Sequence, residues 1–159
     1  MKIRYTNSIN IDEFNYIRAS VGFSQFHPEQ VKAEIEGSTL MIAAYEKEKI
    51  IGMASLFWCG GVSASIYVFV VPEYRLNGIE DEMIIMIFNY LKDKLKPGFG
   101  IQVDVNAFSR NQVDLYENLG FKISTTEQRG IPMHICLTNQ IEITDKMYKQ
   151  LEYSEFKMI

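Results

Sequence analysis

Three residues of the sequence, an arginine, a glycine and a tyrosine, are of types and at positions that could serve ligand binding or catalysis. Arg75 and Gly78 lie in a short segment between an apolar run and a helical pattern. Backbone N–H groups at a helix start have no internal partner, glycine lets a ligand approach them, and a guanidinium binds phosphate. Such a turn could hold a pyrophosphate. The alternative is an ordinary strand–turn–helix connection with a surface arginine.

The segments on either side of this turn are predicted to be a buried strand and a helix. Residues 66–71 are all β-branched or aromatic and carry no charge, which is typical of a strand buried on both faces. Pro72 ends the strand, since proline cannot donate to a central ladder. From Ile79 to Leu95 the apolar residues recur at helical spacing. This order places Arg75 and Gly78 at the start of the helix.

A second candidate is Tyr116, in a predicted helix from Arg110 to Leu119 that Ser109 can cap and Gly120 ends. A phenol, with a pKa of about 10, is protonated at neutral pH and can donate a hydrogen bond or a proton. The alternative is a tyrosine that packs its ring under the sheet and keeps its hydroxyl at the surface.

Two segments resemble the GNAT superfamily of N-acetyltransferases. Residues 70–79, VVPEYRLNGI, resemble the family's V-x-P-x-x-R-x-x-G-x-G/A segment, which binds acetyl-CoA. Residues 115–121, LYENLGF, resemble its L-Y-E-K-L-G-F, and the two occur in the family's order. The resemblance covers roughly Met1 to Thr138. It implies an enzyme that moves the acetyl group of acetyl-CoA directly to a primary amine.

The resemblance also implies roles for individual residues. The backbone of Phe69, Val70 and Val71 would pair with the pantetheine arm, the turn would bind the pyrophosphate, and Tyr116 would be the general acid. Ser109 stands where the family often has asparagine, although capping the helix would also explain it. The implied cofactor-binding residues are Phe69, Val70, Val71, Arg75, Leu76, Asn77, Gly78, Ile79, Glu80, Ser109 and Asn111.

Glu80 departs from the family pattern, because the family has glycine or alanine there. Asp81 and Glu82 follow it. Carboxylates suit the first turn of a helix, but they compete with phosphate for the same N–H groups and repel it by about 1 kcal/mol per charge pair. The alternative function is therefore a degenerate relative that binds CoA, another ligand or a partner without catalysis.

The acceptor side is less well defined by the sequence. His27 lies in the loop that lines the acceptor site in the family, and Tyr67 is the only titratable side chain of the central strand, so both are candidate substrate-binding residues. His27 could equally be an ordinary loop residue. No general base is assigned: the proton could leave through water to Asp104, or the amine could arrive neutral. The acceptor is expected to be a small-molecule or peptide amine.

The remaining patterns predict an α/β (α+β) fold of the GNAT-like acyl-CoA N-acyltransferase type. It would have a central mixed, mostly antiparallel sheet with helices on both faces. The predicted strands are 2–6, 40–45, 50–58, 66–71, 101–105, 121–124 and 133–137, and the helices are 11–20, 28–36, 79–95, 110–119 and 144–156. Residues 1–138 would form one domain, with 139–159 as a helical extension packed on it. A homodimer built by this tail and the helix of Met83 and Met86 is the alternative.

Composition excludes several classes of protein. The 159 residues are 47% hydrophobic, which suits one domain with a sizeable core. The net charge of −4 argues against nucleic acid as a partner. No apolar run reaches about 18 residues, so no membrane span is expected, and the N-terminal residues lack the apolar core of a signal peptide. A cytoplasmic location follows as the expectation. Two histidines and two cysteines without ligand spacing predict no metal site.

Overall fold

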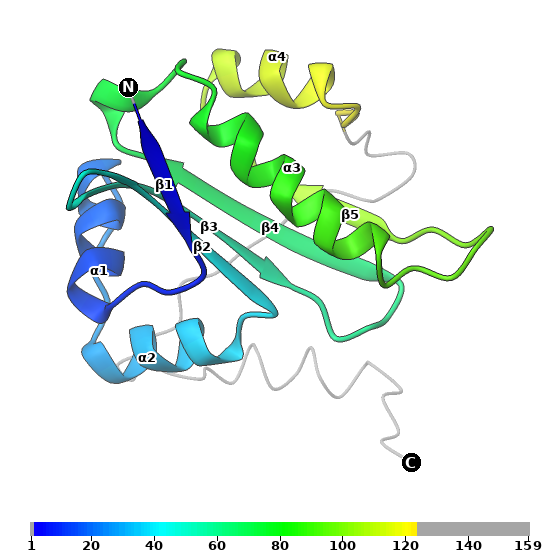
Figure 1. Ribbon diagram of the computed structural model, residues 1–159, viewed down its shortest axis with the longest axis horizontal. Coiled ribbons are helices and arrows are strands. Elements are labelled where there is room, and N and C mark those ends of the chain that lie inside the picture. Colours follow the sequence, from blue (N-terminus) through cyan, green and yellow to red (C-terminus); the bar gives the residue numbers. More distant parts are fainter. Residues whose placement is uncertain (1, 124–159) are drawn as a thin grey trace, which may run out of the picture. The chain divides into compact units, whose positions relative to one another are not determined.

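The computed structural model describes residues 2–123, in which one sheet is packed between helices (Figure 1). The strands are β1 (Ile3–Thr6), β2 (Leu40–Glu46), β3 (Lys49–Phe57), β4 (Ser63–Val70) and β5 (Gln102–Val105). The helices are α1 (Ile11–Ser20), α2 (Pro28–Gly37), α3 (Ile79–Lys92) and α4 (Arg110–Asn118), with a short 3-10 helix at Pro72–Tyr74. The strands lie in the order β1-β2-β3-β4-β5, and only the β4–β5 pair is parallel. The described part up to Lys122 forms one compact unit.

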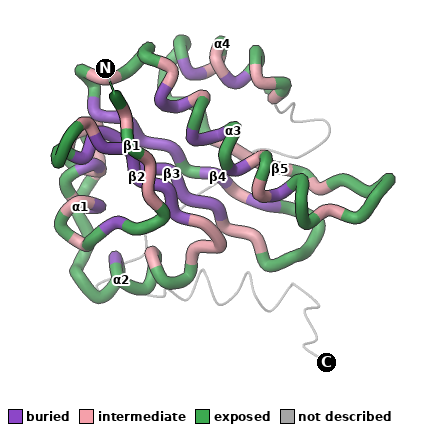
Figure 2. Tube along the Cα trace, in the orientation of Figure 1, coloured by how far each residue is buried: buried purple, intermediate pink, exposed green. Residues whose placement is uncertain are grey.

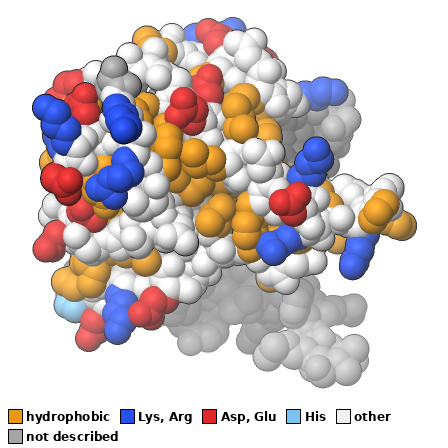
Figure 3. All heavy atoms as spheres, in the orientation of Figure 1, with side chains coloured by type: hydrophobic (Ala, Val, Ile, Leu, Met, Phe, Trp, Pro, Cys, Tyr) orange, Lys and Arg blue, Asp and Glu red, His pale blue; other side chains and the backbone are white. Residues whose placement is uncertain are grey.

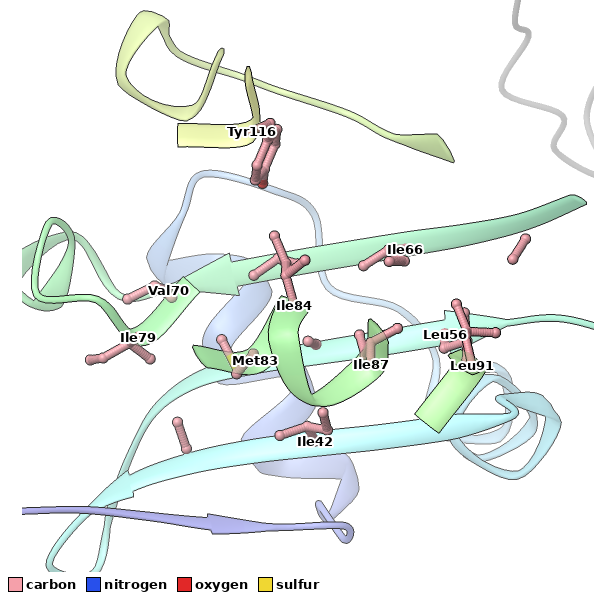
Figure 4. Close-up of a cluster of buried hydrophobic side chains, with 14 of the residues drawn as sticks. Ile42, Leu56, Ile66, Val70, Ile79, Met83, Ile84, Ile87, Leu91 and Tyr116 are labelled. Atoms are coloured by element: carbon pink, nitrogen blue, oxygen red, sulfur yellow. The ribbon is translucent and has the colours of Figure 1, made fainter. Parts of the chain in front are cut away.

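The buried residues lie mainly along the strands and on α3 (Figure 2), and their side chains form two clusters, one on each face of the sheet. Successive strand residues point to opposite faces, so Val68 and Val70 join one group while Phe69 and Val71 join the other. On the first face α3 supplies most of the contacts, and Figure 4 shows its side chains pointing at the strands. The α3 residues that pack there are Ile79, Met83, Ile84, Ile87 and Leu91. On the second face α1 and α2 supply Phe14, Ile17 and Val31. The mixed sheet with helices on both faces is thus confirmed.

The helices begin where the sequence has capping residues. Asn10 Oδ1 accepts from the N–H of Glu13 at 2.9 Å, and Ser109 Oγ accepts from the N–H of Gln112 at 3.3 Å. Each bond satisfies one of the free N–H groups of a helix start. The predicted bounds of all four helices and five strands agree with the structure to within three residues. The 3-10 turn at Pro72–Tyr74 was not predicted.

The prediction of a strand over 121–124 is wrong for residues 121–123, which are not in a strand. Phe121 instead ends α4: its N–H donates to the carbonyl of Tyr116 at 2.9 Å, and Gly120 adopts a φ of 97° that glycine accepts without strain. Ser124, the predicted strand 133–137, the predicted helix 144–156 and the extension 139–159 lie outside the described residues.

Met83 is fully buried in the core under α3, so it is not available for a contact between two copies of the chain. The exposed large hydrophobic residues of α3 are Ile85 and Met86, and hydrophobic side chains gather over this helix on the face shown in Figure 3. Within residues 2–123, no helix is long and apolar enough to cross a membrane.

A glycine allows the close approach of β3 and β4 in the middle of the sheet. A Cβ added at Gly52 would stand 3.2 Å from the carbonyl oxygen of Phe69 and 3.2 Å from Val70 Cγ2. Gly52 lies opposite Val70 in the β3–β4 register. Because the nearest atom belongs to the backbone of the central strand, it cannot move aside as a flexible side chain would.

Gly52→Ala should therefore lower the free energy of unfolding by about 1–3 kcal/mol through overpacking. Gly37→Ala is the matched control. It adds the same methyl group at the end of α2, meets nothing within 4 Å, and should raise stability by up to about 1 kcal/mol. Urea denaturation of both variants measures the difference. Equal effects of the two substitutions would contradict the close packing described here.

Candidate active site

Among the described residues, nothing pairs with one side of the central strand along half of its length. β4 pairs with β5 only from Ser63 to Ile66, whereas it pairs with β3 as far as Val70. The N–H of Val71 donates to the carbonyl of Ile51 on β3 at 2.9 Å. Backbone groups alternate in direction along a strand, so those of Val68 and Val70 point to the side that β5 has left. An extended ligand could pair with this open edge.

This geometry changes the expectation for the backbone of residues 69–71. Phe69 and Val71 direct their N–H groups to β3, where they form the sheet, so neither is free for a ligand. The groups on the open side belong to Val68 and Val70, and the carbonyl of Val70 already accepts from Arg75 Nε at 3.2 Å. Arg75 therefore lies against the end of the open edge.

The turn after β4 presents further backbone donors. Leu76 and Gly78 have φ angles of 63° and 78°, and Asn77 Nδ2 donates to the carbonyl of Tyr74 at 3.2 Å. A left-handed leucine costs about 1–2 kcal/mol, so the turn stores strain that its surroundings must hold. Among the described residues, no acceptor is recorded for the N–H groups of residues 79–81 at the start of α3. A turn of this kind can bind an anion.

The carboxylates of the first turn of α3 are directed to neighbouring elements. Glu80 is only 7% exposed, and its Oε1 accepts from Gln112 Nε2 at 2.9 Å. Tyr5 of β1 donates its hydroxyl to Glu82 Oε2. The sequence led us to expect that these carboxylates would compete with a phosphate for the N–H groups of their own helix. Because Glu80 and Glu82 bind other elements, these two side chains do not occupy those N–H groups. Their negative charges remain beside the turn.

Tyr116 is the buried phenol of α4. It is 3% exposed, its ring points from α4 toward β4 in Figure 4, and its hydroxyl has no hydrogen-bond partner in the described structure. Burial raises the pKa of the Tyr116 phenol, and the charge of Glu80 raises it further. The group therefore stays protonated at neutral pH and is available as a donor. A buried hydroxyl without a partner costs about 1–3 kcal/mol, which needs an explanation.

A narrow hollow of about 40 Å³ lies where β4 and β5 separate. Its walls include Val68, Val70 and Arg75 on one side and Ser109 and Gln112 of α4 on the other. Three aromatic rings also border it: Phe108 lies 5.2 Å from Phe23 and 6.3 Å from Phe69 between ring centroids. Phe108 is held beside the hollow because its N–H donates to Gln112 Oε1 at 2.8 Å.

A larger cavity of about 370 Å³ lies on the face of the sheet that carries α1 and α2. Tyr67 lines it, as does Phe69, which therefore borders both cavities. His27 does not line it: His27 Nδ1 accepts from the N–H of Glu29 at 3.3 Å and so caps α2. Asp104, the carboxylate considered for proton removal, accepts from Gln102 Nε2 at 3.2 Å on β5 and lines neither cavity.

The structure brings some of the sequence-derived candidates together and leaves others apart. Phe69, Val70, Arg75 and Ser109 border the hollow. Leu76, Asn77, Gly78 and Ile79 form the turn and the helix start, although the Ile79 side chain belongs to the core. Glu80 reaches the hollow through Gln112. Asn111 is exposed on α4 and borders neither cavity.

Sequence reasoning missed Gln112, Phe108, Phe23 and Arg18. Gln112 could have been found, because it stands one helical turn before Tyr116 and so shares its face of α4. Arg18 stands one turn after Phe14 on α1 in the same way. Nothing in the sequence marked the two phenylalanines, which meet only after folding.

One comparison with known proteins identifies a family. The family model for the acetyltransferase (GNAT) domain matches residues 11–138. No curated protein sequence matches the chain significantly.

Solved structures resemble the chain in fold. A protein of unknown function from meticillin-resistant Staphylococcus aureus has a TM-score of 0.74 at 20% identity, over 86% of this chain and 100% of its own. A GNAT-family acetyltransferase from Streptococcus pneumoniae has a TM-score of 0.65 at 17% identity, over 87% and 98%. The ribosomal-protein-S18-alanine N-acetyltransferase of Escherichia coli has a TM-score of 0.62 at 15% identity, over 78% and 80%.

The unpartnered hydroxyl of Tyr116 gives a test of whether this residue serves stability or function. Tyr116→Phe should raise the free energy of unfolding by about 1 kcal/mol, since it removes a buried polar group that has no partner. Tyr45→Phe is the control, because the Tyr45 hydroxyl donates to Glu13 Oε2 at 2.9 Å. The control should lose about 1 kcal/mol. Thermal and urea unfolding measure both, and a loss of stability in Tyr116→Phe would show that the hydroxyl has a partner after all.

Proposed function

Because the chain belongs to the GNAT acetyltransferase family, whose general activity is acyl transfer, we propose that it moves the acetyl group of acetyl-CoA directly to a primary amine. The observation that carries the proposal is the hydroxyl of Tyr116, which is buried without a hydrogen-bond partner among the described residues and whose ring points from α4 toward β4 (Figure 4). An extended thioester requires two features: a strand edge with free backbone groups along which it can bind, and a hydrogen-bond donor for its leaving sulfur. The acceptor amine is not specified by the family.

The residues present fit acetyl-CoA. The N–H groups of Val68 and Val70 and the carbonyl of Val68 suit the amide groups of a pantetheine arm, which can pair with a strand edge as another strand would. The uncapped start of α3, with Gly78 before it, suits a pyrophosphate, and Arg75 adds a positive charge nearby. Acetyl-CoA itself supplies the activated acyl group for transfer.

The protein side of the chemistry is positioning and hydrogen-bond donation. A thiolate, whose conjugate thiol has a pKa of about 8.5, is a weaker base than a phenolate, and burial raises the pKa of Tyr116 further, so complete proton transfer from Tyr116 is unfavourable. Tyr116 would instead stabilise the charge that develops on the leaving sulfur by donating a hydrogen bond. Cys59 is exposed and borders neither cavity, which favours direct attack by the amine over a covalent intermediate.

Two observations favour the second candidate, a relative that binds a ligand without catalysis. The hollow beside β4 measures only about 40 Å³, and the ring of Phe108 forms part of its wall. Glu80 also places a carboxylate beside the expected pyrophosphate site. For acetyl-CoA to bind, the hollow would have to widen at Phe108, and the pyrophosphate would have to bind in spite of the charge of Glu80.

Tyr116→Phe should lower kcat by about 100-fold and leave the Kd for acetyl-CoA within about twofold, since the hydroxyl acts on charge that forms only during transfer. Release of free CoA thiol with a panel of primary amines measures kcat, and calorimetry measures the Kd. Tyr45→Phe, which is remote from both cavities, is the control. An unchanged kcat in Tyr116→Phe would remove the donor role.

Glu80→Gln separates the two candidate functions. The substitution keeps an oxygen for Gln112 and removes the negative charge beside the turn, so affinity for acetyl-CoA should rise about fivefold. If the protein is an enzyme, turnover persists in this variant. Binding that appears or improves without any release of thiol would favour the ligand-binding candidate instead.

A further inference from the structure

The larger cavity is lined mostly by apolar and aromatic side chains, together with the charged side chains of Arg18 and Glu34. Its floor consists of two cross-strand pairs, Met53 opposite Phe69 and Ser55 opposite Tyr67. Phe14 and Arg18 of α1 form one wall, α2 forms another, and the loop residue Phe26 adds a further aromatic surface. About 370 Å³ is room for a small molecule rather than for a folded partner.

Among residues 2–123, Arg18 is the only cation that lines this cavity. Its Nε donates to the carbonyl of Ser24 at 3.0 Å, which fixes the guanidinium. The guanidinium carbon lies 4.5 Å from the ring centroid of Phe26, 5.4 Å from that of Phe23 and 6.0 Å from that of Phe69. Three aromatic rings and the carbonyl of Ser24 therefore hold the guanidinium of Arg18 in a defined position at the side of the cavity.

The charge of Arg18 is not neutralised by a close carboxylate. None of the salt bridges in the described part of the chain involves Arg18. Burial lowers the pKa of the guanidinium, and the charge of Glu34 on α2 raises it only in part. A partly buried guanidinium without an ion-pair partner is well suited to bind an anionic group in a bidentate manner.

Arg18 lies close to the part of β4 along which the acyl group is proposed to bind. Phe69 borders both cavities, and Arg18 lies over its ring. Phe69 also stands on β4 between Val68 and Val70, whose backbone groups form the open edge. An anion held by Arg18 would therefore lie beside the edge along which the acyl group is proposed to bind.

We propose that this cavity binds an amine that carries a carboxylate next to its amino group, as a free α-amino acid does, with the carboxylate on Arg18. The inference rests on the proposed acetyl transfer, whose acceptor it specifies. An α-amino acid has one carbon between carboxylate and amine, so anchoring the carboxylate at Arg18 places the amine near Phe69. The remaining side chain then extends over the apolar surface of Phe14, Phe26 and Met53.

A cationic acceptor held by Glu34 is the competing occupant. Glu34 is exposed to solvent on α2, where screening weakens its attraction, whereas Arg18 is partly buried and held by three rings. An acceptor with only positive charge would also be repelled by Arg18 next to the place of transfer. The structure therefore favours an acceptor with a negative group.

The test compares acids with their amides, which differ only in the group that Arg18 would bind. Leucine, methionine and phenylalanine, each beside its own amide, are titrated calorimetrically into the full-length protein with and without CoA. At least one acid should bind, and its amide should bind about 10- to 100-fold more weakly, the range of a charge-assisted pair. Absence of binding by all three acids, or amides that bind as well as the acids, would overturn the proposal.

Variants of Arg18 and Glu34 assign the effect to a residue. Arg18→Gln should abolish the preference for acid over amide, Arg18→Lys should keep part of it, and Glu34→Gln should leave it in place. Unfolding curves establish that each variant is folded, and the acid–amide comparison in the unsubstituted protein does not depend on them. A preference that survives Arg18→Gln but is lost in Glu34→Gln would overturn the proposal in favour of the cationic acceptor.

Failure of this inference is distinguishable from failure of the proposed function. Thiol release that is equally fast with acids and amides would keep acetyl transfer and reject the anion site. Binding of the acids that depends on Arg18, without thiol release under any condition, would keep the anion site and reject acetyl transfer.

Discussion

The early separation of β5 from β4 is the constraint on which the site depends. Backbone N–H and C=O groups in a protein interior need partners, and a central strand normally finds them on both sides. Within the described part of the chain, β4 has them on both sides only as far as Ile66, and beyond that point β3 alone pairs with it. The N–H groups of Val68 and Val70 and the carbonyl of Val68 then face a hollow walled by α4 and the turn after β4. The strand is thereby both the centre of the core and the edge to which an extended ligand can bind.

The contacts around this edge link three separate parts of the chain. Gln112 donates to Glu80 at the start of α3 and accepts from the N–H of Phe108, so one amide side chain joins α3, α4 and the loop before α4. The same arrangement seals Tyr116 from water next to the charge of Glu80. An unpartnered phenol and a buried carboxylate both reduce stability, and sites with such costs are common where a ligand completes the structure.

Much of the fold could be predicted from the sequence, because its signals are local. Apolar residues at helical spacing predicted α3, an uninterrupted apolar run predicted β4, and Ser109 marked the start of α4, which it caps. The divergence of β4 and β5 could not be predicted, since both strands have ordinary strand patterns and only their spatial path separates them. The contact between Glu80 and Gln112 spans 32 residues and likewise leaves no local pattern. Glu80 was expected to obstruct the helix start, whereas its side chain is engaged with α4.

The most direct test of the account is to follow individual backbone amides of the ¹⁵N-labelled protein by NMR while acetyl-CoA is added. The account predicts that the amide signals of Val68 and Val70 shift and their hydrogen exchange slows, because their N–H groups gain acceptors. The amide of Val71, bonded to Ile51 in the sheet, should change little. Saturable binding that leaves Val68 and Val70 unchanged, or no binding at millimolar acetyl-CoA, would contradict the assignment of the open edge of β4 as the cofactor site.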